Sequence, residues 1–115
     1  MSPRLIRPKK ASSVRRSREL CEFLDCCEDE WLRNKVQEAE ASLKENRELG
    51  VKIPKDLWPK QYVRKWGIRN LFKCDLGPDW RMTYTLVLNG AGIAVLELEV
   101  LPHKEYDRRF GYRTT

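Results

Sequence analysis

An arginine inside a predicted strand is the residue in this sequence best suited to bind an anion. Arg81 lies in the run WRMTYTLVL, where alternating apolar residues predict a strand. Strand interiors favour apolar and β-branched side chains, so an arginine there is expected to have a charged partner. Its planar guanidinium stays charged and can hold two phosphate oxygens at once. The structural alternative is an ion pair with Glu97 or Glu99 on the same predicted sheet face.

The only histidine, His103, is the natural candidate for proton transfer. It follows Pro102 at the predicted end of a strand, among basic residues. Histidine titrates near neutral pH and can therefore act as a general acid or base, although a lone histidine can equally have a structural role. Tyr106, three residues later, is expected to be either its acid–base partner or a platform for base stacking.

Basic residues in the second half of the chain are candidates for contacts with RNA phosphates. The candidates are Lys60, Arg64, Lys65, Lys73, Lys104, Arg108 and Arg109. Lys73 could equally be a solvated strand lysine. Trp58, Tyr62 and Trp66 alternate with the first of these residues, which is typical either of a base-stacking surface or of aromatic anchors that pack a loop; for the tryptophans we favour the anchors.

Length and charge place limits on the function. The 115 residues predict one domain over 1–115 that can bury one modest core. The net charge of +6 and the pI near 9.3 indicate an anionic partner such as nucleic acid. No apolar run approaches the roughly 20 residues of a membrane span, and the N-terminus lacks the apolar core of a signal peptide. We therefore expect a cytoplasmic protein without membrane contact.

The four cysteines do not predict a metal site. Cys21, Cys26, Cys27 and Cys74 form no CxxC pair, and one histidine is too few to complete a usual zinc site. We expect reduced, partly buried thiols, no metal and no cofactor; a disulfide would be reasonable in a hyperthermophile.

Two helices are expected to position the predicted strands. Ser12 or Ser13 could cap a first helix with Leu20, Phe23, Leu24 and Cys27 on one face. A second helix has an apolar stripe at Leu32, Val36, Ala39 and Leu43, with Gly50 as its expected stop. Residues 4–9 could add a short edge strand, and Pro59 could start a short helix that ends at Gly67.

The period changes from helical to alternating after Asn70. The segments NLFKCDL, WRMTYTLVL and GIAVLELEVL predict three antiparallel strands. In the second, Met82 and Tyr84 should face the helices, while Arg81 and Thr83 should lie on an open, polar face. In the third, alternation places Leu98 and Val100 on one face. The predicted fold is α+β, with an N-terminal helical hairpin packed on a twisted antiparallel sheet.

With these elements in order, the chain resembles the RelE/ParE superfamily of toxin–antitoxin systems. Arg81 and Tyr84 form an R-x-x-Y pattern in the central hairpin, and IAVLELEVLPHKEY resembles the family's last strand and terminal motif. The resemblance runs from the first helix through Tyr112. The chain departs from the family in its longer, tryptophan-rich segment 51–68 and in the continuation DRRFGYRTT, where Phe110 and Tyr112 are expected to anchor the tail.

The resemblance implies a RelE-like toxin that cleaves mRNA on the ribosome without a metal and so inhibits translation. Arg81 would then stabilise the charged phosphorane, with Lys73 holding the backbone phosphate, and His103 and Tyr106 would transfer protons. It also implies a cognate antitoxin that covers the basic face. The alternatives are a ParE-like, non-enzymatic inhibitor of DNA gyrase and an inactive nucleic-acid-binding protein of the same fold.

Overall fold

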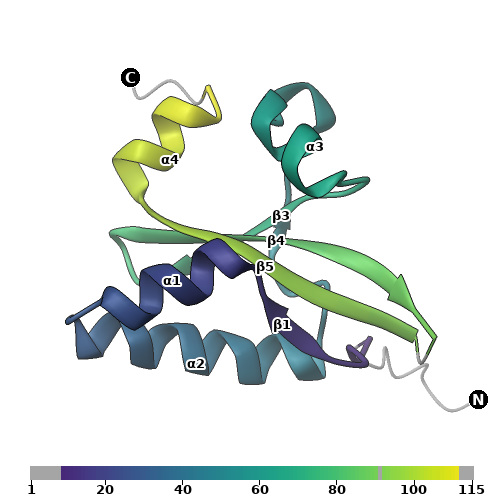
Figure 1. The fold of residues 1–115 in the computed structure, drawn as a ribbon, viewed down its shortest axis with the longest axis horizontal. Coiled ribbons are helices and arrows are strands. Elements are labelled where there is room, and N and C mark those ends of the chain that lie inside the picture. The colour runs from purple at the N-terminus through teal and green to yellow at the C-terminus, as the bar shows by residue number, and fades with distance from the viewer. Residues whose placement is uncertain (1–8, 91, 112–115) are drawn as a thin grey trace, which may run out of the picture.

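The computed structural model describes residues 9–90 and 92–111, which form an α+β fold (Figure 1). The helices are α1 (Arg18–Cys26), α2 (Glu30–Glu45), α3 (Lys60–Trp66) and α4 (His103–Arg109), with a short 3-10 helix η1 (Lys55–Leu57). The strands are β1 (Val14–Arg16), β2 (Val51–Lys52), β3 (Phe72–Leu76), β4 (Trp80–Asn89) and β5 (Gly92–Pro102). Within these residues, no helix is both long enough and apolar enough to cross a lipid bilayer.

The described strands form one mixed sheet in the order β1-β5-β4-β3-β2. The predicted antiparallel meander is confirmed for β3, β4 and β5. The expectation of a purely antiparallel sheet is wrong, because β1 runs parallel to β5, and β1 also precedes both helices of the predicted N-terminal hairpin. The edge strand predicted over 4–9 lies outside the described residues apart from Lys9, which belongs to no strand.

The first helix begins later in the sequence than predicted, because the residues before it form β1. We predicted a cap at Ser12 or Ser13, but the cap is Ser17, whose hydroxyl accepts the Leu20 N–H at 3.0 Å and donates to the Leu98 carbonyl at 2.7 Å. Residues 14–16 are extended and pair with β5, so the helix begins only after them. The cap therefore fixes α1 to the sheet as well as satisfying its first turn.

The end of the second helix also differs from the prediction. α2 ends at Glu45 with Asn46 as its C-cap, four residues before Gly50, the expected stop. Gly50 instead lies against the sheet, where its N–H donates to the Tyr84 hydroxyl at 2.9 Å. Glycine is required there by close packing with β3 and β4. The predicted short helix after Pro59 is confirmed as α3, and Gly67 ends it in the left-handed conformation at φ 56°.

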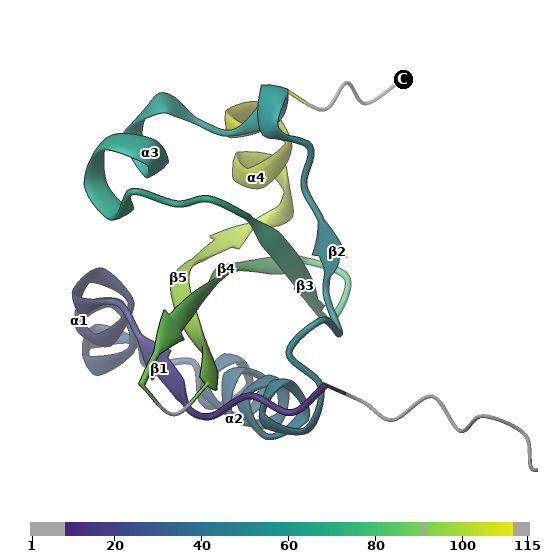
Figure 2. The ribbon, with the colours of Figure 1, turned by 90° about the vertical axis from the view of Figure 1, so that its right-hand side faces the viewer.

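α1 and α2 cover one face of the sheet, as predicted (Figure 2). Their buried leucines and Val36 contact the predicted inner residues of β4. The principal members of this first cluster are Leu20, Leu24, Leu32, Val36, Leu43, Phe72, Met82, Tyr84, Val95 and Val100. Burial of this apolar surface is the main stabilising contribution on this side.

The other face of the sheet is covered by α3 and α4, although we predicted it to be open and polar (Figure 2). Thr83 and Thr85 are fully buried beneath this layer. The second cluster consists of Ile53, Tyr62, Ile68, Leu71, Leu98, Leu101, Tyr106 and Phe110. Alternation along one strand cannot reveal such a cover, because its residues come from two short helices distant in the sequence.

A β-bulge in β5 changes which side chains share a face. Thr83 pairs with Glu99, whereas the next residue, Tyr84, pairs with Glu97, so Leu98 is inserted in the register. Leu98 belongs to the second cluster and Val100 to the first, which corrects the prediction that they share a face. Glu97 faces the first cluster, and its pKa is raised by burial and by the neighbouring Glu40 carboxyl.

Candidate functional site

Arg81 lies at the β3–β4 hairpin and is paired with Asp75. Its Nε is 3.0 Å from the Asp75 Oδ1, and its Nη1 donates to the Pro78 and Trp80 carbonyls. Asp75 and Arg81 are opposite each other in the antiparallel register, which explains the contact. The alternative that we considered, a pair with Glu97 or Glu99, is wrong, because the bulge turns Glu97 to the other face and Glu99 binds Arg109.

Lys73 contacts the same carboxylate oxygen as Arg81. Its Nζ is 2.8 Å from the Asp75 Oδ1 and 6.0 Å from the centre of the Tyr106 ring. The side chains of Lys73 and Arg81 are each 19% exposed, whereas that of Asp75 is 54% exposed. Two cations thus converge on one oxygen atom at the rim of the sheet, a geometry that also suits a phosphate oxygen.

His103 begins α4 at the same end of the sheet. Pairing of Trp80 with Pro102 brings β5 beside the start of β4, and the His103 N–H donates to the Asp79 carbonyl at 2.7 Å. The imidazole is 36% exposed, and its Nδ1 is 3.9 Å from the Asp107 Oδ2. His103 is therefore accessible, and it follows Leu101, the strand partner of Arg81, by two residues.

Tyr106 is placed differently from His103. Its side chain is only 2% exposed, and its ring stacks on Phe110 with a centroid distance of 4.5 Å. A substrate would have to displace neighbouring side chains to reach this ring. The expectation that Phe110 anchors the tail is confirmed, since it is 1% exposed; Tyr112 lies outside the described residues.

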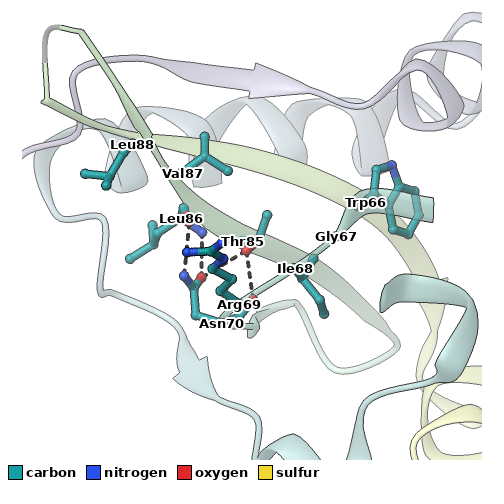
Figure 3. A pocket seen from close by; sticks show the side chains of 9 residues that line it. All are labelled: Trp66, Gly67, Ile68, Arg69, Asn70, Thr85, Leu86, Val87 and Leu88. Carbon is teal, nitrogen blue, oxygen red and sulfur yellow. Dashed lines mark hydrogen bonds between the residues drawn. The ribbon is translucent and has the colours of Figure 1, made fainter. Parts of the chain in front are cut away.

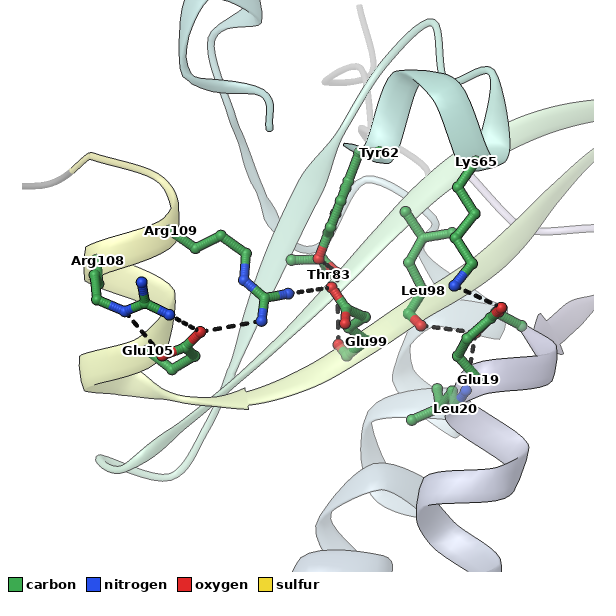
Figure 4. Close-up of polar contacts among 11 residues, drawn as sticks. Glu19, Leu20, Tyr62, Lys65, Thr83, Leu98, Glu99, Glu105, Arg108 and Arg109 are labelled. Carbon is green, nitrogen blue, oxygen red and sulfur yellow. Dashed lines mark hydrogen bonds and ion pairs between the residues drawn. The ribbon is translucent and has the colours of Figure 1, made fainter. Parts of the chain in front are cut away.

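Besides Lys73, three of the predicted RNA-binding cations are engaged in ion pairs (Figure 4). Arg109 joins Glu99 of β5 to Glu105 of α4, at 2.9 and 3.0 Å. Arg108 also binds Glu105, and Lys65 binds Glu19 of α1 at 2.8 Å. Hydrogen bonds from Arg108 and Arg109 hold the pKa of Glu105 below its ordinary value. The Lys65–Glu19 pair connects α3 to α1, and the Arg109–Glu99 pair connects α4 to β5.

Three other predicted cations are available to an anion. Lys60, Arg64 and Lys104 are exposed and form no ion pair within residues 9–90 and 92–111. Lys60 and Arg64 lie one turn apart on α3, and Lys104 is the second residue of α4. Both helices lie on the same side of the sheet (Figure 1). These three available cations therefore lie on the two helices that cover the second cluster.

Asp75 is missing from the site that the sequence predicts, and Tyr62, considered there for base stacking or for anchoring a loop, is buried. The Tyr62 hydroxyl is 3.0 Å from the Thr83 Oγ1 in the buried centre of the sheet (Figure 4), and burial raises the pKa of Tyr62. Nothing in the sequence indicates this contact. Asp75 could have been found, because a symmetrical hairpin around GPD places it opposite Arg81.

A hollow of about 340 Å³ lies beside β4, between residues 66–70 and 85–88 (Figure 3). The Asn70 side chain closes part of the strand edge by accepting the Leu86 N–H at 2.7 Å and donating to its carbonyl at 3.0 Å. Leu88, on the rim, is 85% exposed. The walls are largely apolar, the Asn70 amide is already satisfied by the strand, and Arg69 is the one charged side chain among the lining residues (Figure 3).

The thiols and carboxylates offer no metal site in the described part of the chain. All four cysteines are free thiols: Cys21 and Cys26 are exposed, and Cys27 and Cys74 are partly buried. Burial raises the pKa of Cys74 to about 12, so this thiol is protonated at neutral pH. Across residues 9–90 and 92–111, no three His, Cys, Asp or Glu side chains are grouped closely enough to hold a metal ion.

Comparison with known proteins gives no relative: the chain matches no family model, no curated protein and no solved structure.

Proposed function

We propose that this protein is a RelE-like toxin, a metal-independent endoribonuclease that cleaves mRNA on the ribosome. The convergence of Lys73 and Arg81 on one carboxylate oxygen supports this proposal most directly. A phosphate oxygen in place of the Asp75 Oδ1 would receive both cations. Asp75 is exposed enough to rotate away when RNA arrives, and its loss as a partner would then be compensated by the phosphate.

In this mechanism the ribose 2′-hydroxyl is the nucleophile, and the protein supplies charge and proton transfer. Arg81 stabilises the negative charge that develops on the phosphorane, because its charge is fixed and its fork matches two oxygens. His103, accessible at the same end of the sheet, takes the proton of the 2′-hydroxyl as the bond from phosphorus to the 5′-oxygen breaks, and returns that proton to the leaving 5′-oxygen. Because Tyr106 is buried, we propose that its ring supports Lys73 instead of transferring a proton.

A cell-free translation assay tests this function. Arg81→Ala and His103→Gln should each abolish cleavage of a ribosome-bound mRNA, while Arg15→Ala, which removes an exposed arginine from β1, should leave it unchanged. A reduction of more than about a hundredfold is expected for each site variant, given the usual effect of losing a proton-transfer or charge-stabilising group. Cleavage that survives both substitutions would exclude this mechanism.

A ParE-like toxin, which binds gyrase without catalysis, is the second candidate. It is favoured by the buried Tyr106 and by the ion pair that occupies Arg81, since a binding protein needs neither group to be free. Unimpaired translation together with blocked DNA supercoiling would support this alternative. Both candidates imply an antitoxin, and a small acidic protein encoded beside this chain would fit its basic face.

A further inference from the structure

A second hollow, of about 310 Å³, lies between η1 and α3. It is lined by Lys55 of η1, by Trp58, and by Lys60, Val63 and Arg64 of α3. Lys60, Val63 and Arg64 are spaced so that they occupy one side of α3, while Tyr62 and Trp66 pack on the sheet from the other. The walls are therefore an aromatic ring and an apolar side chain surrounded by three cations.

The three cations of this hollow are not neutralised. Lys55, Lys60 and Arg64 are exposed and make no ion pair in the described part of the chain. By contrast, Lys65, Lys73, Arg81, Arg108 and Arg109 are all paired with carboxylates. The positive potential of the hollow is thus available to a ligand without breaking an existing ion pair.

Trp58 is held in a fixed orientation at the wall of the hollow. Its indole N–H donates to the Ile53 carbonyl at 2.9 Å, and the ring is partly buried against the second cluster. Val63 is 46% exposed although it is apolar. A flat ligand can therefore stack on the indole without the entropic cost of ordering that side chain.

We propose that this hollow binds one nucleotide of a single-stranded nucleic acid, with the base against Trp58 and its phosphates at Lys55, Lys60 and Arg64. Every base has a π-face that can stack on an aromatic ring, and flanking cations follow the backbone. A duplex fits poorly, because its base faces are already stacked. The proposal deepens the proposed function: RNA bound here would extend on the side of the sheet that carries α4.

Binding of short end-labelled oligoadenylates, followed by fluorescence anisotropy without ribosomes, tests the hollow. Trp58→Leu should weaken binding about tenfold, whereas Trp58→Phe should retain most of it, because stacking contributes about 1–3 kcal/mol per base. Circular dichroism of both variants checks that they fold. Comparison of ribo- and deoxyribo-oligonucleotides shows whether RNA or DNA binds more tightly. A preference for either one supports the site.

Charge is tested with two triple variants of equal net charge. Replacing Lys55, Lys60 and Arg64 by alanine should reduce both the affinity and its salt dependence, whereas replacing Arg15, Arg18 and Lys35 should have a much smaller effect. Equal losses in both triples would overturn the proposal, as would tighter binding of duplex RNA. Displacement of the oligonucleotide by a polyglutamate peptide, with no effect of Trp58→Leu, would assign the hollow to an acidic protein instead.

The outcome is separable from that of the proposed function. If Arg81→Ala loses mRNA cleavage but still binds oligonucleotides, the hollow is supported as a binding site that does not depend on catalysis. Unchanged binding by Trp58→Leu and by the hollow triple would exclude the hollow even if Arg81 and His103 prove essential for cleavage.

Discussion

At the scale of single residues, Asp75 decides how much positive charge the candidate site presents. It binds both Lys73 and Arg81 through one oxygen. Asp75→Asn removes the competing charge and should tighten single-stranded RNA binding about two- to fivefold, the range expected for one partly exposed ion pair. Anisotropy titrations at low salt would measure the change.

Asp79→Asn is the matched control for this prediction. Asp79 lies in the same hairpin turn, its side chain forms no ion pair in the described residues, and its substitution changes the net charge equally. Equal gains in both variants would show that RNA responds to overall charge and not to the cation pair.

Glu97 and Glu40 form a second group whose charges depend on the fold. Burial raises the pKa of Glu40, but the bidentate hydrogen bonds from Arg16 outweigh this effect and hold it below the ordinary value. Burial and Glu40 raise the pKa of Glu97, so the folded protein keeps a proton there that the unfolded chain loses above about pH 4.3. The contribution of this proton to stability is therefore lost as pH rises.

Glu97→Gln imitates the protonated acid and should remove this pH dependence. Between pH 5 and pH 9 the free energy of unfolding of the wild-type protein should fall relative to the variant by more than about 1 kcal/mol. Urea unfolding at both pH values would measure it. The exposed substitution Glu28→Gln should follow the wild type, and a parallel decline of Glu97→Gln would contradict a protonated Glu97.

At the scale of elements, the α2–β2 connection depends on Gly50. A Cβ there would lie 2.5 Å from the Lys73 carbonyl oxygen and 2.8 Å from the Tyr84 ring. Gly50→Ala should therefore cost about 1–3 kcal/mol of stability, since backbone or ring must shift. Gly90 has nothing within 4 Å, so Gly90→Ala is the control. Similar thermal midpoints for both variants would show that the α2–β2 connection accommodates a methyl group at residue 50 with little loss of stability.

The elements also show why the faces of β5 were mispredicted. Perfect alternation would keep Leu98 beside Val100, but the extra residue at the bulge reverses the order after Glu97. The bulge is set by pairing with β4, a contact between separate strands. Periodicity correctly predicted that the segment is a strand, but it contains no information about register.

At the scale of the whole molecule, two apolar clusters share one sheet. Above it, the Phe110 ring contacts the rings of both Tyr62 and Tyr106, whereas α1 and α2 pack below. Because β5 contributes Val95 and Val100 to the first cluster and Leu98 and Leu101 to the second, we expect one cooperative unfolding transition.

Phe110→Ala tests this cooperativity. Loss of a buried ring should destabilise the protein by about 3–5 kcal/mol. Tryptophan fluorescence and far-ultraviolet circular dichroism should report the same lowered midpoint, and Phe110→Leu should lose less. A separate, earlier fluorescence transition would show that the α3–α4 layer unfolds on its own.

The sequence by itself determined the two N-terminal helices, α3, the three central strands and the faces of β4, because each follows from side-chain spacing within one segment. It also identified Arg81, Lys73 and His103 as candidate site residues, and the structure places all three at one end of the sheet. Tertiary structure decided the parallel β1, the cover formed by α3 and α4, the burial of Tyr106 and the pairing of Arg81 with Asp75. Those features depend on contacts between distant segments, and only folding brings their charges and apolar surfaces within reach of each other.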